Sequence, residues 1–169
     1  KPYEGNPKPR MGRLIMSRSL LVNKGFKNDG MGAIIKKFNG IKLDYPAGLS
    51  IGKTNSSEIA TQETAIADII SAFKKAESAN LTFAYYELNI SCPNLFGNVS
   101  FYPPGNLQAL LLALSDINIK KPVFIKMPIS EPDEDVVKML EVIHSFPLVA
   151  GVIFGNLERN RNHPSLLPE

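Results

Sequence analysis

The chain has 169 residues, 44% of them hydrophobic and 21% charged, so it is long enough for one soluble domain with a proper core. Its formal net charge of +3 comes from lysines and arginines that are not interleaved with a set of aromatic residues, which argues against a nucleic-acid-binding protein. A single cysteine excludes an internal disulfide, and no charged and then apolar leader opens the sequence, so we expect a reducing, cytoplasmic setting.

The first quarter of the chain is irregular and then helical. Residues 1–13 hold three prolines and two glycines without hydrophobic periodicity, which predicts an extended surface loop. The two short apolar runs at 14–16 and 20–22 predict a small hairpin. Apolar residues then recur at i, i+3, i+4 and i+7 between two breaks that contain Asn and Gly, which predicts a helix over residues 31–38.

From residue 45 onward, apolar runs alternate with amphipathic helical patterns. Strands are expected at 45–51, 83–88, 122–127 and 149–154. One helix is expected from its cap at Thr61 to about Ala79, a second over 106–114, and a third from Pro132 at its first position, with Val136, Leu140 and Ile143 on its core face. This alternation predicts βαβ units and a parallel sheet.

Polar residues mark the ends of all four expected strands. They are Ser50, the hexapeptide 89–94, Lys126 and Asn156. Each has a purely structural alternative, since Ser50 is small enough to be packing, Lys126 can extend to the edge, and Asn156 follows Gly155 as a turn residue would. Because parallel strands end at the same edge of a sheet, where α/β folds bind ligands, we expect these groups to converge.

The hexapeptide Asn89-Ile90-Ser91-Cys92-Pro93-Asn94 joins two amides, a hydroxyl and the only thiol of the chain. Pro93 disfavours helical backbone at Cys92, so we expect the thiol in an extended or turn conformation. Cys92 is a candidate nucleophile or base, and the alternative is a small buried hydrophobe. The patternless loop at 95–105 suits a lid or binding loop. Metal-ligand spacing, a phosphate-binding glycine fingerprint and a Ser/His/Asp order are all missing from the sequence.

The run at 87–94, Glu-Leu-Asn-Ile-Ser-Cys-Pro-Asn, closely resembles the catalytic strand end of dihydroorotate dehydrogenases, flavoenzymes of pyrimidine biosynthesis built on a (β/α)8 barrel. Further segments resemble the membrane-associated, quinone-using class, at 8–14, 25–30 and 48–55, and the next two barrel strands, at 122–126 and 151–156. The resemblance implies that residues 1–169 form a single partial FMN-dependent barrel domain of about four βα units.

The resemblance also implies a reaction and a general base. Dihydroorotate would lose a proton from C5 and a hydride from C6, giving orotate, and the hydride would pass to N5 of FMN. Cys92 would take the proton, which a thiol with an ordinary pKa of about 8.5 can do near neutral pH if its thiolate is favoured.

The same resemblance assigns ligand contacts. Asn89, Asn94 and Asn156 would hold the carboxylate and ring amides of the substrate, with Asn23 as a further contact. Lys126 would lie beside N1 and the C2 carbonyl of the flavin. Three residues would line the FMN pocket, namely Ser50, Asn89 and Gly155, and the loop at 95–105 would close over the site.

Four positions depart from the pattern of the quinone-using class. Cys92 stands where that class has serine, so the expected acceptor is either a quinone or a soluble oxidant. Val22 occupies the position of an expected asparagine, with Asn23 next to it, Ser50 replaces an asparagine, and Leu157 replaces a hydroxyl residue. A peripheral contact with the inner face of the cell membrane would need a segment upstream of this sequence.

The length suggests a central fragment, because a complete barrel needs about 250 residues and eight strands. A half-barrel exposes two sheet edges, so we expect aggregation or pairing with a second copy. Two other functions stay open: a related FMN barrel that oxidises another dihydropyrimidine, and an inactive half-barrel that serves as a binding or assembly module. Flavin absorbance separates the last of these from both enzymes, and turnover of dihydroorotate against dihydrouracil separates the enzymes.

Overall fold

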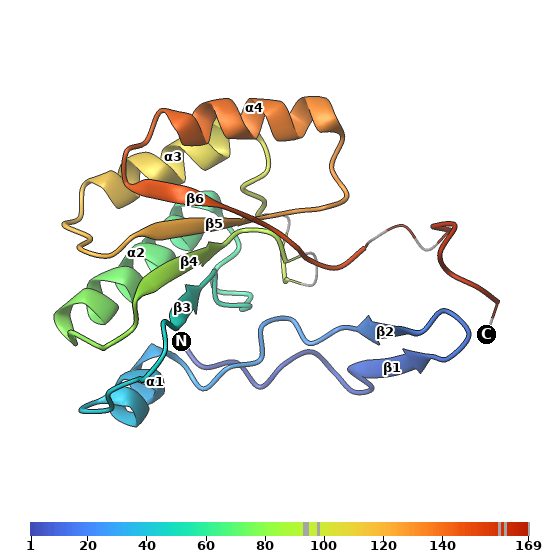
Figure 1. Ribbon diagram of the computed structural model, residues 1–169, viewed down its shortest axis with the longest axis horizontal. Helices are drawn as coiled ribbons and strands as arrows, with labels where there is room; N and C mark the ends of the chain where they lie inside the picture. The colour runs from blue at the N-terminus through green and yellow to red at the C-terminus, as the bar shows by residue number, and fades with distance from the viewer. Residues whose placement is uncertain (93–94, 98, 159, 161, 169) are drawn as a thin grey trace.

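The computed structural model describes residues 1–92, 95–97, 99–158, 160 and 162–168. The strands are β1 (Met11–Leu14), β2 (Ser19–Val22), β3 (Gly48–Ile51), β4 (Tyr85–Asn89), β5 (Val123–Met127) and β6 (Val149–Phe154). The helices are α1 (Met31–Phe38), α2 (Gln62–Ser78), α3 (Pro104–Ser115) and α4 (Asp133–His144). Figure 1 shows α2, α3 and α4 together on one face of the main sheet, with the β1–β2 hairpin set apart from it.

The main sheet has four parallel strands in the order β3-β4-β5-β6, which is also their order along the chain. Helices α2, α3 and α4 therefore each carry the chain from one strand to its immediate neighbour, which is the repeating unit of a (β/α)8 barrel. The expected fold class, four parallel βα units of an incomplete barrel, is confirmed. All four strands end at one edge, so the groups that follow them meet there.

One face of the sheet packs against the helices and forms the core. Tyr86 and Leu88 of β4 are 1% and 0% exposed, and the alternate residues of β5 are buried as well. Helix α2 begins where predicted, because Thr61 forms a capping box with Thr64. The helices bury apolar residues against the strands, among them Ile69 and Phe73 of α2, and Leu107, Leu110, Leu111 and Leu114 of α3.

The opposite face of the sheet carries a pair of aromatic rings. The rings of Tyr85 and Phe124 meet edge to face, with their centroids 5.4 Å apart and an interplanar angle of 79°. Glycines lie beside both rings: a Cβ added at Gly48 would come within 2.2 Å of the Tyr85 ring, and one at Gly151 within 3.2 Å of Phe124. The two rings thus lie side by side on the sheet face opposite the helices, before the carboxyl ends of β4 and β5.

The boundaries of several elements differ from the sequence prediction. The hairpin exists, but its first strand is Met11–Leu14 and not 14–16, since backbone pairing with residues 19–22 places residues 11–13 in the strand and not in a loop. Helix α3 begins at Pro104, and Pro132 caps α4 instead of occupying its first position. Within α4 the fully buried residue is Met139, at 0% exposure, while Val136 and Leu140 are only partly buried.

The segment after β6 returns to the hairpin, where the backbone N–H of Leu167 donates to Ser17 Oγ at 2.8 Å (Figure 1). In the described part of the chain, each helix is too short or too polar to cross a bilayer.

Candidate active site

Three predicted residues lie on neighbouring strands at the carboxyl edge of the sheet. The register pairs Ser50 of β3 with Glu87 of β4, and Asn89 of β4 with Lys126 of β5. Ser50 Oγ donates to Glu87 Oε1 at 2.7 Å, and Asn89 Nδ2 donates to the same oxygen at 3.4 Å. The sheet therefore brings Ser50, Asn89 and Lys126 to one edge as expected, and Ser50 and Asn89 share the carboxylate of Glu87, which was not among the predicted site residues.

Glu87 could have been found from its spacing. It lies two residues before Asn89 in a strand, so both side chains point to the same face. A charged residue in an otherwise apolar strand is unusual unless it has a partner. The register that gives Glu87 its contact with Ser50, however, is a property of the folded sheet.

Asn156, just beyond β6, joins the end of β4 through Ser91. Its Nδ2 donates to the carbonyl oxygen of Ser91 at 2.6 Å and also to Ser91 Oγ, and its Oδ1 accepts from the backbone N–H of Leu157 at 2.8 Å. Ser91 is 2% exposed and turns to Asn89 as well, where its backbone N–H and its Oγ donate to Asn89 Oδ1 at 3.3 and 3.1 Å. Ser91 thus links the two asparagines, a role the sequence did not indicate.

Cys92 is half-buried and lines a cavity of about 350 Å³. The cavity walls also include Asn89, Lys53 and aromatic residues of the loop before α3, Phe101 and Tyr102. Asn94, a predicted substrate contact, lies outside the described residues. Gly155 is half-buried, and a Cβ added there would meet no atom within 4 Å, so its surroundings are open.

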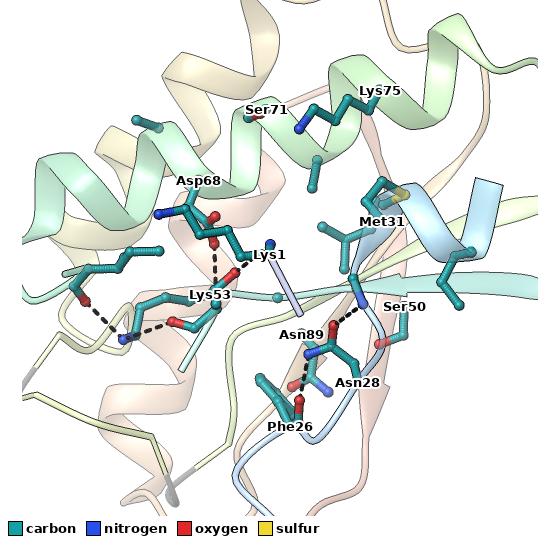
Figure 2. Close-up of a pocket in the computed structure, with 18 of the residues that line it drawn as sticks. Lys1, Phe26, Asn28, Met31, Ser50, Lys53, Asp68, Ser71, Lys75 and Asn89 are labelled. Carbon is teal, nitrogen blue, oxygen red and sulfur yellow. Dashed lines mark hydrogen bonds between the residues drawn. The ribbon is translucent and has the colours of Figure 1, made fainter. Parts of the chain in front are cut away.

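A larger cavity of about 780 Å³ lies on the other side of Asn89, between β3, α1 and α2 (Figure 2). Its walls include Ser50 and Asn89, and it is bordered by Phe26. A Cβ added at Gly52 would come within 2.9 Å of the Phe26 ring and 3.0 Å of the Asn89 carbonyl oxygen, so only glycine fits there. Cys92 is not among the residues lining this cavity. We therefore centre the candidate site on the smaller cavity and the strand edge that both cavities share.

Lys53 is a buried lysine that joins the end of β3 to the loop after Cys92. It is 3% exposed, and its Nζ donates to the carbonyl oxygens of Ile59 at 3.1 Å and Phe96 at 3.0 Å. Burial lowers the pKa of Lys53, and the charge of Asp68 acts in the opposite direction. Its ammonium is engaged by the protein itself, so Lys53 fastens the loop after Cys92 to the end of β3.

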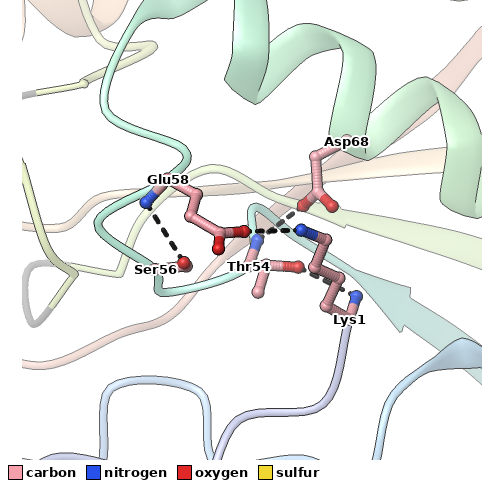
Figure 3. Close-up of polar contacts among 5 residues, drawn as sticks. All are labelled: Lys1, Thr54, Ser56, Glu58 and Asp68. Carbon is pink, nitrogen blue, oxygen red and sulfur yellow. Dashed lines mark hydrogen bonds and ion pairs between the residues drawn. The ribbon is translucent and has the colours of Figure 1, made fainter.

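The segment after Lys53 is held by a second polar cluster, drawn in Figure 3. The backbone N–H of Thr54 donates to Asp68 Oδ2 at 2.7 Å, which ties the segment to α2. At the rim, Lys1 Nζ and Glu58 Oε2 form an exposed ion pair at 2.7 Å. An exposed pair of this kind contributes little to stability, so the partly buried hydrogen bond from Thr54 to Asp68 holds the segment more firmly.

Asn23 lies in a different cluster from the other predicted site residues. It is exposed, and its Oδ1 accepts from Asn6 Nδ2 at 2.7 Å. Asn6 Oδ1 in turn accepts from Asn55 Nδ2 at 3.0 Å, and Asn55 accepts from the backbone N–H of Phe96. Asn23 therefore belongs to a series of amides that joins the N-terminal segment to the loop at 95–105. Both backbone groups of Phe96 are bonded, so the start of this loop is anchored.

Within the described ranges, no three His, Cys, Asp or Glu residues lie close enough to hold a metal ion. Four parallel strands joined in chain order by α2, α3 and α4, with amides and a cation at their carboxyl edge and a thiol just beyond, define part of an α/β barrel with its candidate site at the strand ends.

Comparison with known proteins then identifies the family. The dihydroorotate dehydrogenase family profile matches residues 1–165, and the chain belongs to that family. A quinone-type dihydroorotate dehydrogenase of Mycolicibacterium smegmatis is 30% identical over 162 residues, 96% of this chain and 44% of that protein. One of Sphingopyxis alaskensis is 34% identical over 139 residues, 78% of this chain and 36% of that protein. The chain therefore spans less than half the length of these relatives.

Solved structures show the same fold. A ligand-free dihydroorotate dehydrogenase of Eimeria tenella superposes with a TM-score of 0.81 at 22% sequence identity, covering 100% of this chain and 52% of that one. Its complex with ferulenol gives a TM-score of 0.81 at 19% identity, covering 98% and 50%. At these identities the likeness concerns the fold alone.

Proposed function

We propose that this chain supplies the substrate-side half of an FMN-dependent enzyme that oxidises dihydroorotate to orotate in pyrimidine biosynthesis. The observation that carries the proposal is the meeting of Asn89 and Asn156 on Ser91, directly before Cys92, in a chain of the dihydroorotate dehydrogenase family. Residues 1–169 act in this proposal as a single partial domain.

The residues at the strand edge fit a flavin. Lys126 provides a half-buried cation of the kind that stabilises an anionic reduced ring, and it stands opposite Asn89 in the register. Gly52 lets Phe26 and the Asn89 carbonyl oxygen approach the end of β3, and Gly155 leaves open space after β6. Ser50, Asn89, Lys126 and Gly155 would hold FMN, and bound FMN would supply the hydride acceptor for the reaction.

Cys92 would act as the general base. Its Sγ would take the proton from C5 of dihydroorotate, while the hydride leaves C6 and the C5–C6 bond becomes the double bond of orotate. Asn89 and Asn156 would hold the ring, with Asn94 and Asn23 proposed as further contacts. The half-buried position of Cys92 in a cavity lined by Phe101 and Tyr102 would limit water at the thiol.

The electron acceptor that we propose is a quinone, because the two relatives described above carry that acceptor in their names. A soluble acceptor remains the alternative that Cys92 favours through its resemblance to the soluble class. Steady-state turnover with a short-chain quinone, fumarate or NAD as the only oxidant distinguishes them.

The experiment that tests the function uses the protein expressed from its complete gene. Purified wild-type protein should carry flavin absorbance, and anaerobic addition of dihydroorotate, but not dihydrouracil, should bleach it. Cys92→Ala should keep the flavin and bleach at least about a hundredfold more slowly, the usual scale for loss of a general base. Cys92→Ser should be slower than wild type and need a higher pH. Protein without flavin, or a Cys92→Ala variant that bleaches at the wild-type rate, would refute the assignment.

A further inference from the structure

Glu87 is the fixed end of a series of hydrogen bonds at the site. An ionised carboxylate can only accept, so both of its neighbours must donate to it. Ser50 Oγ does so at 2.7 Å and Asn89 Nδ2 at 3.4 Å. The contact settles the orientation of the Asn89 amide: its nitrogen faces Glu87, and its oxygen must face the other way.

Ser91 carries this direction onward. The oxygen of Asn89 accepts from the Ser91 backbone N–H at 3.3 Å and from Ser91 Oγ at 3.1 Å. Because the hydroxyl proton is spent on Asn89, Ser91 Oγ can only accept from Asn156, and it accepts from Asn156 Nδ2. The Ser91 carbonyl oxygen accepts from the same amide nitrogen at 2.6 Å. Every polar group of this buried serine is thus used to orient the two asparagines.

We propose that Glu87 and Ser91 are positioning residues that fix which atoms the site offers to its ligand. Asn89 keeps one amide N–H without a partner among the described residues, whereas Asn156 has its amide N–H groups turned to Ser91 and keeps a lone pair on Oδ1. The site therefore presents a donor from β4 and an acceptor from the end of β6. This pair matches a ring edge where a carbonyl stands near an N–H, and the inference rests on the proposed function.

Two isosteric changes test the series, each with a matched control. Glu87→Gln gives the end group a donor of its own and releases the orientation of Asn89, and Ser91→Ala removes the hydroxyl while leaving both backbone contacts. Glu141→Gln, on the exposed surface of α4, controls for loss of a carboxylate. Ser115→Ala controls for loss of a hydroxyl, since Ser115 Oγ donates to the carbonyl of Leu111 within α3, away from the site.

The first measurement needs no substrate. In the NMR spectrum of the protein expressed from its complete gene, the side-chain amide signals of Asn89 and Asn156 are assigned by their loss in Asn→Ala variants. Glu87→Gln should shift both pairs of signals, although of the two asparagines Asn89 is the one that donates to Glu87, and Ser91→Ala should shift both as well. Unchanged Asn156 signals in Glu87→Gln would overturn the series, whatever the protein binds.

The second measurement is the affinity of the flavin-loaded protein for orotate, by titration. Glu87→Gln and Ser91→Ala should each weaken binding about tenfold, the scale of one lost hydrogen bond to a buried group. The double variant should bind orotate only slightly more weakly than the single variant with the lower affinity, because both substitutions act through one series of hydrogen bonds. Losses that multiply, or controls that weaken binding equally, would mean general damage and overturn the proposal. If wild type binds no orotate, the proposed function fails, and the inferred role of the series toward a ligand fails with it, while the NMR result still decides the orientation.

Discussion

Gly48 gives the sharpest test of the packing on the sheet face opposite the helices. Its ideal Cβ would lie 2.2 Å from Tyr85 Cε2 and 2.4 Å from Cζ, where ordinary contact begins at 3.4 Å, so in Gly48→Ala the ring must move by roughly 1 Å. This movement disturbs the edge-to-face contact with Phe124, which is worth about 0.5–1.5 kcal/mol. With the usual cost of overpacking, about 1–3 kcal/mol, we expect the free energy of unfolding to fall by about 2–3 kcal/mol.

The assay is urea unfolding of the purified chain, followed by far-ultraviolet circular dichroism. Gly105→Ala is the control, since a Cβ there meets no atom within 4 Å and lies in α3, so it should leave stability unchanged or raise it by up to about 1 kcal/mol. In a Tyr85→Ala background, Gly48→Ala should cost little, because the obstructing ring is gone. A Gly48→Ala variant as stable as wild type, or equally destabilised in both backgrounds, would refute the close approach.

Four other predictions concern the cap, the core, the buried lysine and the cation of the site. Thr61→Ala should lower the free energy of unfolding by about 1 kcal/mol in the same urea assay, through loss of the α2 cap. Leu111→Ala should cost about 2–5 kcal/mol, whereas its neighbour Leu112→Ala, 54% exposed in the native protein, should cost far less. Because burial lowers the pKa of Lys53, the unfolded chain binds that proton more tightly; stability should rise as the pH increases from the folded-state pKa toward 10.5, and Lys53→Met should flatten this rise in urea titrations across that range. Lys126→Ala should weaken retention of FMN as well as flavin reduction, measured as flavin content after desalting; an intact content would contradict its role.

The sequence predicted the elements whose signals are local. The apolar spacing of α1 and the cap at Thr61 each depend on a few adjacent residues, and both were predicted correctly. The hairpin was displaced because Met11, Gly12 and Arg13 have no strand pattern of their own and are strands only by pairing with residues 20–22. Met139 was overlooked on α4 because the direction of a helix face depends on the neighbouring helix.

The candidate site divides in the same way. Strand ends that carry polar residues could be placed at one edge from topology alone, and Ser50, Asn89 and Lys126 do lie on adjacent strands. The contacts of Glu87, Ser91 and Asn55 could not be predicted, since each depends on register or on a partner 37 to 65 residues away. Asn23, assigned by resemblance, shares its amide contacts with Asn6 and Asn55, a placement that only the folded N-terminal segment determines.

The parallel sheet also fixes the distances between the polar groups at its carboxyl edge. Neighbouring strands are spaced about 4.8 Å apart, so groups on β3 and β6, which are three strand spacings from each other, are separated by about 14 Å. Substitutions can change which chemical group a strand end carries, but they cannot change the spacing between neighbouring strand ends. A slip of one residue in the register of any strand would turn its polar groups toward the helix layer and remove them from this edge of the site. Backbone pairing therefore fixes the spacing of the groups that a ligand at this edge can contact.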